Sequence, residues 1–258
     1  MPAFYTHYLI AQHALCRLEE PLQSEIRRFS SLYFCGAHGA DFCFFYKLLP
    51  RLYKPIFNTQ NKAKRNLGSY LHREGGYDAV CIMKRFAMRD KAYLAYALGY
   101  LTHYATDVCF HPFVYEQAGT SLLKHSRLEH AFDGYFRQQY PIERFSAQKF
   151  PREKLSDSER NLLFSLYATI ADRAGFPPLD KAEFIRSMNA FNATLPTAFR
   201  FFYGFSREKN FRFAHVGETL YQNACEFSDE VIDSFLSSLS NHSPLSYELF
   251  GKNYLTGI

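Results

Sequence analysis

Residues 96–130 constrain the fold most, because ionisable side chains recur there at one helical spacing. Candidate metal ligands follow each other at steps of four residues in two groups: His103, Asp107 and His111, then His125 and Glu129. Residues four apart lie on the same face of a helix, one turn above each other. Imidazole and carboxylate groups stacked in this way can converge on one metal ion.

The segment that precedes His103 is apolar, so the helix that carries these residues is expected to be buried. A buried Asp beside a buried His needs a partner or a cation, because an unpaired buried charge is costly. A single His–acid pair is also compatible with a satisfied pair on a helix surface or in a core. We interpret the cluster as a metal site because five candidate ligands share one short stretch.

Helical periodicity extends over most of the chain, and no strand-like alternation rivals it. The predicted helices are 6–19, 22–33, 61–73, 78–88, 90–110, 121–138, 160–174, 181–203, 210–227 and 229–239. Pro112 is expected to end or kink the helix at 90–110, and Pro196 to interrupt or kink that at 181–203. The predicted fold is therefore an all-α multi-helix bundle, with residues 1–258 forming a single domain.

The composition excludes several function classes. A formal net charge of +5 is too small and too scattered to indicate nucleic acid, so no stable nucleic-acid binding is expected. The N-terminal residues lack the features of a signal peptide, and no apolar run is long enough to span a bilayer. Six cysteines show neither metal-ligand nor disulfide-framework spacing. These features predict a cytoplasmic protein with reduced thiols.

Three further residues of metal-ligand type precede the central stretch. His7 lies in the first predicted helix, Asp41 follows a turn that contains Gly36 and Gly39, and His72 closes the helix at 61–73. Together with the central five they give eight nitrogen and oxygen ligands and no thiolate, which suits zinc or another borderline divalent metal. Eight ligands exceed what one tetrahedral zinc uses, so a cluster of two or three ions follows.

In their order and spacing these motifs resemble the zinc-dependent phospholipase C family, which is related to the S1/P1-type nucleases. The resemblance is carried by Thr6-His7, G-A-x-G-x-D at 36–41, His72, H-x3-D-x3-H at 103–111 and H-x3-E at 125–129. All of these motifs lie within residues 1–130. The length of the chain and its helical pattern also fit the family, so the resemblance is expected to cover the whole domain.

The resemblance implies how the ligands are shared among the ions. One zinc would be held by Asp41, His72, His103 and Asp107, and a second by His111, His125 and Glu129. A third would be held by His7, with Asp107 as a bridging carboxylate. Asp41 would also be the general base for the attacking water.

The resemblance also implies a substrate. Family members hydrolyse a phosphodiester and typically release diacylglycerol and a phosphorylated head group, so peripheral contact with a membrane is expected. Most aromatic side chains, including the runs at 199–205 and 211–213, are interpreted as core. If those runs were exposed, Arg200 and Arg212 within them would suit an anionic lipid surface.

One departure from the family concerns the third zinc. Secreted members complete that site with the amine and carbonyl of a mature N-terminal Trp, and this chain contains no Trp. The amine of Pro2 after removal of Met1, or a water, is the alternative ligand. Two zinc ions are therefore expected, and occupancy of the third site is left open.

Three functions stay open at this point. The first is hydrolysis of a phospholipid or head-group phosphodiester by metal-activated water. The second is a single-strand nuclease of the S1/P1 type, which needs an aromatic pocket that stacks a base beside the metals. The third is a metal-binding protein of the same fold without catalysis. His38 is a candidate for supporting the ligands, whereas His13, His130, His215 and His242 are assigned to surface or core positions.

Overall fold

The computed structural model describes residues 4–47, 66–142, 154–203 and 212–258, with side chains given outside 195–203. All regular elements in these ranges are helices, so the all-α prediction is confirmed. They are α1 (Phe4–Arg17), α2 (Glu20–Arg28), α3 (Ser30–Gly36), η1 (Asp41–Phe45), α5 (Leu67–Arg73), α6 (Gly76–Ala87), α7 (Lys91–Ala118), α8 (Leu122–Gln139), α9 (Asp157–Arg173), α10 (Lys181–Tyr203), α11 (Ala214–Ser240) and α12 (Tyr247–Phe250). None of the helices in these ranges combines the length and apolarity needed to cross a bilayer.

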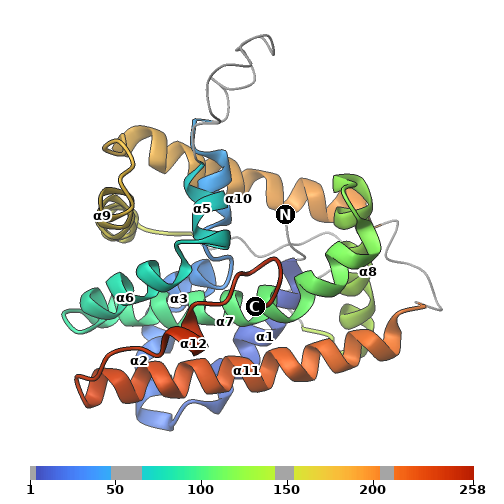
Figure 1. The fold of residues 1–258 in the computed structure, drawn as a ribbon, viewed down its shortest axis with the longest axis horizontal. Coiled ribbons are helices and arrows are strands. Elements are labelled where there is room, and N and C mark those ends of the chain that lie inside the picture. Colours follow the sequence, from blue (N-terminus) through green and yellow to red (C-terminus); the bar gives the residue numbers. More distant parts are fainter. Residues whose placement is uncertain (1–3, 48–65, 143–153, 204–211) are drawn as a thin grey trace.

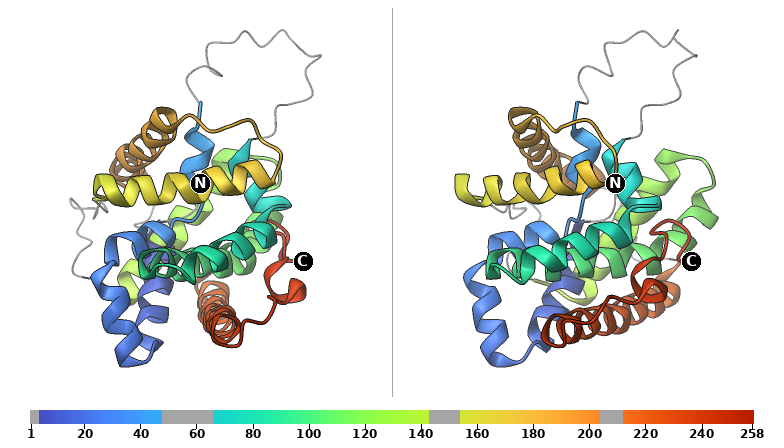
Figure 2. Two further views of the ribbon diagram at one scale, coloured as in Figure 1. Left: turned by 90° about the vertical axis from the view of Figure 1, so that its left-hand side faces the viewer. Right: turned by 60° about the vertical axis from the view of Figure 1, so that its left-hand side comes forward.

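Helix α7 runs through the middle of the molecule, and most other helices pack around it (Figure 1). It contacts α1, α3, α6, α8 and α11, and twenty of its residues are buried. A helix that is apolar on nearly all sides is expected to occupy a core. Figure 2 shows α11 on one side of α7 and the pair α9–α10 on the other. The central stretch of the sequence is thus the central element of the fold.

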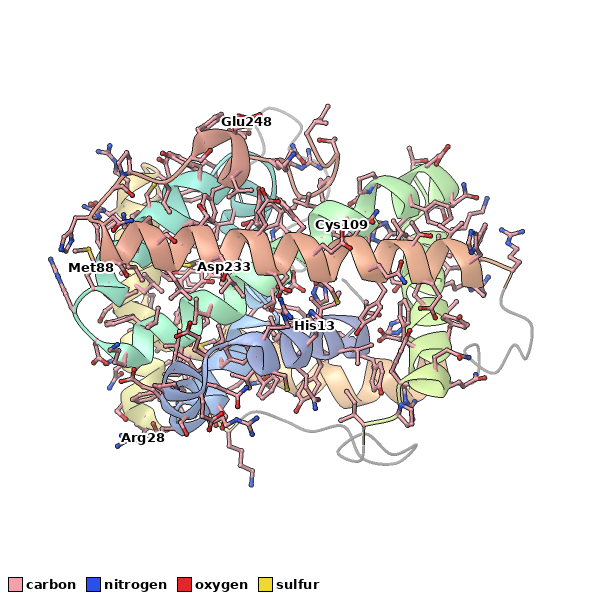
Figure 3. The ribbon with its side chains drawn as sticks, turned by 90° about the horizontal axis from the view of Figure 1, so that it is seen from below. His13, Arg28, Met88, Cys109, Asp233 and Glu248 are labelled. Atoms are coloured by element: carbon pink, nitrogen blue, oxygen red, sulfur yellow. The ribbon has the colours of Figure 1, made fainter. Side chains whose placement is uncertain are left out.

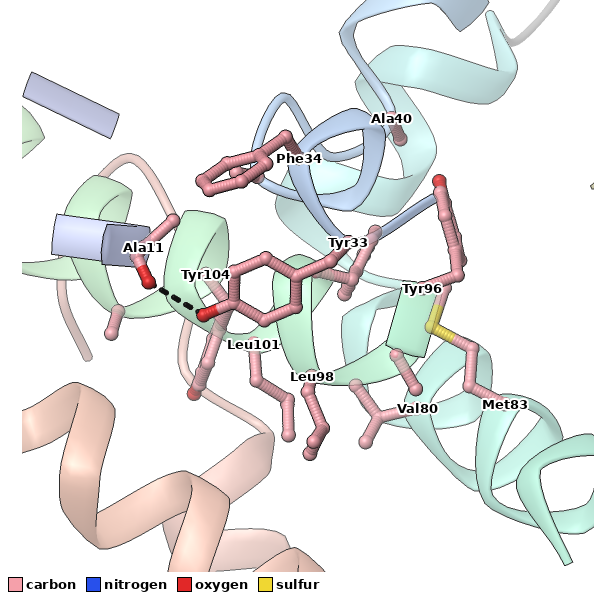
Figure 4. Packing of buried hydrophobic residues seen from close by; sticks show 14 of the residues in the cluster. Ala11, Tyr33, Phe34, Ala40, Val80, Met83, Tyr96, Leu98, Leu101 and Tyr104 are labelled. Carbon is pink, nitrogen blue, oxygen red and sulfur yellow. Dashed lines mark hydrogen bonds between the residues drawn. The ribbon is translucent and has the colours of Figure 1, made fainter. Parts of the chain in front are cut away.

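Helices α3 and α7 approach each other closely through two glycines, Gly36 and Gly99. A Cβ atom added at Gly99 would lie 1.9 Å from the carbonyl oxygen of Tyr33, and one at Gly36 would lie 2.4 Å from that of Tyr96. Helix α1 is held to α3 by a hydrogen bond, which the Tyr33 hydroxyl donates to the carbonyl of Ala11 at 2.7 Å (Figure 4). Helix α3 is therefore in backbone contact with α7 and is hydrogen-bonded to α1, beside the residues that precede His103.

The helix predicted to end or kink at Pro112 does not end there, because α7 continues through this proline to Ala118. A proline inside a helix leaves the carbonyl four residues earlier without its usual donor, here that of Val108. Gly257 from the C-terminal segment lies against both the Val108 carbonyl and the Pro112 ring. Packing by a distant segment therefore covers the site at which the local rule predicts an end.

Two other predicted boundaries are also wrong. The helices predicted at 210–227 and 229–239 form one continuous helix, α11, which crosses the molecule in Figure 3. Ser228, which lies between the two predicted helices, is fully buried within it. The helix predicted at 22–33 divides at Phe29 into α2 and α3. Residues 61–65, 204–211 and Pro2 carry predictions that lie outside the described residues.

Candidate metal centre

The structure brings together all eight predicted ligands from five helices. His7 comes from α1, Asp41 from η1 and His72 from α5, while α7 and α8 supply the other five. Each of the eight residues is at most 7 % exposed. Their potential ligand atoms form three sets, and the atoms of one set all lie within 4.8 Å of one another. The sets are His7, His103 and Asp107; Asp41, His72 and His103; and His111, His125 and Glu129. The predicted residues are therefore close enough to share metal ions.

Asp107 lies at the centre of the cluster. Its Oδ1 is 3.4 Å from His7 Nε2, and its Oδ2 is 3.3 Å from His103 Nε2. The same Oδ2 is 3.7 Å from His72 Nε2 and 3.8 Å from His111 Nδ1. One carboxylate thus reaches four imidazoles, which is the geometry expected of a bridging ligand.

The set formed by Asp41, His72 and His103 is oriented by the backbone. Nδ1 of His72 is 2.7 Å from the carbonyl oxygen of Gly68, which can only accept, so this nitrogen carries the proton. Nε2 of a neutral His72 then presents a lone pair to Asp41 Oδ1 at 3.2 Å and to His103 Nε2 at 3.4 Å. Acceptors facing each other at these distances repel unless a proton or a cation lies among them.

The set formed by His111, His125 and Glu129 has the same organisation. Oε1 of Glu129 is 2.8 Å from His125 Nε2 and 3.3 Å from His111 Nε2. Nδ1 of His111 is 3.1 Å from the carbonyl oxygen of Tyr254, to which it donates. That bond directs the Nε2 lone pair of His111 toward the carboxylate, as second-shell acceptors do for metal-ligating histidines.

The buried polar atoms of the cluster fit a bound cation. Three buried carboxylate oxygens have no hydrogen-bond partner: Asp41 Oδ2, Asp107 Oδ2 and Glu129 Oε2. Buried carboxylate oxygens without partners are costly, and a cation removes that cost. A cavity of about 20 Å³, with His7, Asp107, His111 and Glu129 in its wall, lies between two of the sets and has room for one water or ion. Nitrogen and oxygen donors alone suit zinc.

The electrostatics of the metal-free chain agree with this interpretation. Burial would raise the pKa of Glu129, but nearby positive charge and hydrogen bonds from His111 and His125 hold it below its ordinary value. Burial would lower the pKa of His111, but the charge of Asp107 and the bond to Glu129 raise it to about 9. The carboxylates therefore stay ionised near neutral pH and raise the pKa of His72 and His111, whereas burial lowers the pKa of His103 to about 4. Zinc binding would displace protons held by His72 and His111.

The loop that delivers Asp41 depends on a glycine. Gly39 has φ of +56°, in the left-handed region that glycine adopts without strain. A Cβ atom at this position would lie 2.0 Å from Cδ2 of the His103 ring. The backbone thus packs directly on a ligand, as the two glycines in the sequence motif indicate.

Asp133, which is not among the predicted site residues, orients the helix that carries His7. Its carboxylate accepts hydrogen bonds from the backbone N–H groups of Tyr5, at 3.0 Å, and Thr6, at 2.8 Å, and from the Thr6 hydroxyl at 2.8 Å. Burial raises the pKa of Asp133 to about 6. Its position four residues after Glu129 continues the helical spacing and could have indicated it.

The two buried histidines outside the ligand set lie in the core. His130 is 5 % exposed and its ring lies 6.1 Å from that of Phe4, which agrees with its assignment to a surface or core position. His38, considered a support for the ligands, packs edge-on against Phe4 and Phe191. Burial lowers the pKa of His38 to about 3, so its ring stays neutral.

Tyr254, near the C-terminus, was also missed, and it contacts two of the ligands. Its backbone N–H donates to the carbonyl of His72 at 3.1 Å, and its carbonyl accepts from His111 Nδ1. Its hydroxyl donates to that of Tyr100 at 2.9 Å. One residue therefore joins the His72 backbone to the His111 ring, and no pattern in the sequence signals a backbone carbonyl.

Deleting residues 254–258 is expected to weaken zinc binding by about 10–100-fold, the range typical of lost second-shell contacts. The physical reason is that His111 loses the acceptor that fixes its tautomer. Affinity would be measured by competition with a chromogenic chelator, and circular dichroism would check the helical content. Tyr254→Phe keeps both backbone contacts and should bind zinc as the wild type does. A folded deletion variant with unchanged affinity would show that Tyr254 does not orient His111.

Comparison with known proteins identifies a family that matches the part of the chain that carries the candidate ligands. A family model described as zinc-dependent phospholipase C matches residues 6–175, which include all eight candidate ligands and Asp133. A search of curated proteins and a search of solved structures each gave no match.

Proposed function

The chain belongs to the zinc-dependent phospholipase C family, and from this premise we propose that it hydrolyses a phospholipid or a related head-group phosphodiester. The observation that carries the proposal is the presence of three adjoining ligand sets, two of which share His103 and contact Asp107. A cluster of this kind suits phosphodiester hydrolysis, in which attacking and leaving oxygens both need stabilisation. A site with one isolated ion would not favour this chemistry so strongly.

We assign the eight residues to ions as follows. Asp41, His72, His103 and Asp107 would hold one zinc, and His111, His125 and Glu129 a second. His7 and the bridging Asp107 would contribute to a third. Bound zinc would supply Lewis-acid stabilisation of phosphoryl oxygens and would lower the pKa of water at the site.

Asp41 is the residue that we propose accepts the proton of the attacking water. Hydrogen bonding and charge from His72, together with the charge of His103, hold the pKa of Asp41 below its ordinary value despite burial, which alone would raise it. Its Oδ1 lies 3.2 Å from His72 Nε2, and its Oδ2 has no hydrogen-bond partner. An ionised carboxylate at the metal cluster can serve as a general base. The water oxygen then forms a bond to phosphorus, and the bond to the leaving oxygen breaks.

Replacing Asp41 by Asn is expected to lower phosphodiesterase activity by about 10²–10⁴-fold, because the amide cannot accept this proton. Most of the zinc should stay bound, since seven other ligands are unchanged. Hydrolysis of a chromogenic phosphodiester and zinc content by mass spectrometry would be measured on the same sample. Asp78→Asn, at an exposed position on α6, is the matched control. Turnover close to that of the wild type would exclude Asp41 as the base.

The alternative functions give different results with the same protein. Release of diacylglycerol from phospholipids, with no cleavage of single-stranded DNA, would support the phospholipase. The opposite preference would indicate a nuclease of the S1/P1 type. Two or more bound zinc ions without hydrolysis of either substrate would indicate a metal-binding protein without catalysis.

A further inference from the structure

Helices α7 and α8 supply the ligand set formed by His111, His125 and Glu129. On each of these helices, the face that carries the ligands also carries an exposed apolar side chain. On α7, Tyr115 follows Asp107 and His111 at a step of four residues, and it is 37 % exposed. On α8, Leu122 precedes His125 by three residues, and it is 84 % exposed. Residues three or four apart share a helix face. Tyr115 and Leu122 therefore extend the ligand faces to the rim of the site.

The contacts place this rim next to the ligands themselves. The ring of Tyr115 lies 4.6 Å from that of His125 and 5.6 Å from that of His111, measured between centroids. Leu123, the next residue after Leu122, is 55 % exposed. We define Tyr115, Leu122 and Leu123 as the apolar rim.

The backbone holds the apolar rim in a defined position. Gly119 has φ of +57° and ends α7, and two residues later Ser121 caps α8. The Ser121 hydroxyl accepts a hydrogen bond from the N–H of Lys124. The two leucines therefore occupy the first turn of a capped helix, and their exposure is built into the fold.

Exposed large apolar side chains are concentrated at the apolar rim. The large apolar side chains that are exposed among the described residues are Met88, Tyr115, Leu122, Leu123, Tyr140, Tyr247 and Ile258. Three of these seven form the apolar rim. Scattered single exposures need no explanation, but a group beside a candidate active site indicates a contact surface.

The charges around the apolar rim are mainly positive. Lys124 and Arg127 are exposed on α8, and Arg73 at the end of α5 is near enough to act on the Tyr115 hydroxyl. Glu116 is an exposed acidic residue in the same region. Basic side chains around an apolar tip are the combination that favours binding to a membrane with anionic lipids.

We propose that the apolar rim is the surface with which this protein contacts a bilayer containing anionic phospholipid. Tyr115, Leu122 and Leu123 would enter the boundary between head groups and acyl chains, and the basic residues would face the lipid head groups. This inference rests on the proposed function, since the proposed contact would bring the substrate to the ligand set formed by His111, His125 and Glu129. It differs from a contact through the aromatic runs at 199–205 and 211–213.

A second copy of the chain is a less suitable occupant. Symmetric pairing of two identical rims would bring Lys124 and Arg127 of each copy toward the same cations of the other, which opposes association. Three side chains also cover far less than the roughly 800 Å² per partner that a stable protein interface buries. An anionic lipid surface neither repels these cations nor requires a contact area of that size.

The test compares vesicle binding by the wild-type protein and by the double variant Leu122→Ser/Leu123→Ser. Vesicles of phosphatidylcholine with phosphatidylglycerol, and of phosphatidylcholine alone, would be used in a sedimentation assay. We expect the wild type to prefer the anionic vesicles and the double variant to bind them roughly tenfold or more weakly. Met88→Ser is the matched control, because Met88 is 51 % exposed and lies at the far end of the molecule from α8 (Figure 3). It should bind as the wild type does.

A second measurement separates this proposal from the proposed function. Hydrolysis of a soluble chromogenic phosphodiester should be unchanged in the double variant, whereas hydrolysis of vesicle phospholipid should fall with binding. If the wild type binds vesicles through the rim but hydrolyses neither substrate, the surface is supported and the proposed function fails. Equal vesicle binding by the wild type and the double variant would overturn the surface. A wild-type dimer that the substitutions convert to monomer, detected by light scattering, would overturn it in favour of a second copy.

Discussion

Replacing Asp107 by Asn is expected to remove most of the zinc and to lower phosphodiesterase activity by about a thousandfold or more. Asp107 is the only one of the eight candidate ligands whose oxygens lie within 4 Å of four imidazoles. The amide has nearly the same shape but carries no negative charge. Its nitrogen is a donor and cannot bind a cation. Asp107 is a member of the set with His7 and His103 and also contacts His72 in the neighbouring set, so the substitution affects both of these sets.

The measurement is zinc content by mass spectrometry, together with hydrolysis of a soluble phosphodiester at saturating zinc. Asp90→Asn is the matched control, because Asp90 caps the same helix by accepting from the N–H of Ala92 and Asn caps helices equally well. The control should keep its zinc and its activity. Full zinc content in the Asp107 variant would show that this carboxylate is not a shared ligand and would also weaken the proposed function.

The parts of the site that depend on local spacing could be predicted from the sequence. His103, Asp107 and His111 follow the helical period, and so do His125 and Glu129, because residues on one face of one helix meet whatever the rest of the chain does. Gly36 and Gly39 indicated a tight turn beside Asp41, and Gly39 does pack against the His103 ring. The number of ions and the role of each ligand stay predictions.

The parts that depend on contacts between distant segments could not be predicted. Tyr254 reaches His111 through a backbone carbonyl, a group that every residue has and that no sequence pattern identifies. Asp133 binds the start of α1 across more than a hundred residues. Pro112 and Ser228 misled because helix boundary rules are local, while both positions are held by packing against other elements.

Replacing Gly99 by Ala is expected to destabilise the protein by about 2 kcal/mol or more, although alanine favours helix by about 1 kcal/mol. The added Cβ would lie 1.9 Å from the Tyr33 carbonyl oxygen and 3.1 Å from the backbone nitrogen of Ala37. These are backbone atoms of α3 and of the residue that follows it, and that Tyr33 carbonyl accepts the N–H of Ala37 at 3.0 Å. Neither can rotate away as a side chain would. Helices α3 and α7 must therefore separate.

Gly217→Ala distinguishes this clash from helix propensity. Gly217 is also a buried glycine inside a helix, but the nearest atoms to an added Cβ belong to the Phe132 ring, at 3.0 and 3.2 Å, which can shift. The midpoint of urea unfolding, measured on metal-free protein, should fall clearly for the Gly99 variant and change little for the Gly217 variant. Equal midpoints for the two variants would show that the α3–α7 contact does not limit stability.

The Gly99→Ala substitution should also reduce zinc binding, since Gly99 lies one helical turn before His103. Helix α3 leads directly into the loop that carries Asp41, and α7 carries His103. A separation of these helices therefore moves Asp41 away from His103, with which it shares a ligand set. The set formed by His111, His125 and Glu129 draws only on α7 and α8 and should be affected less. Partial loss of zinc in a folded Gly99 variant, beginning with the ion at Asp41, is the result that follows from this connection between packing and site.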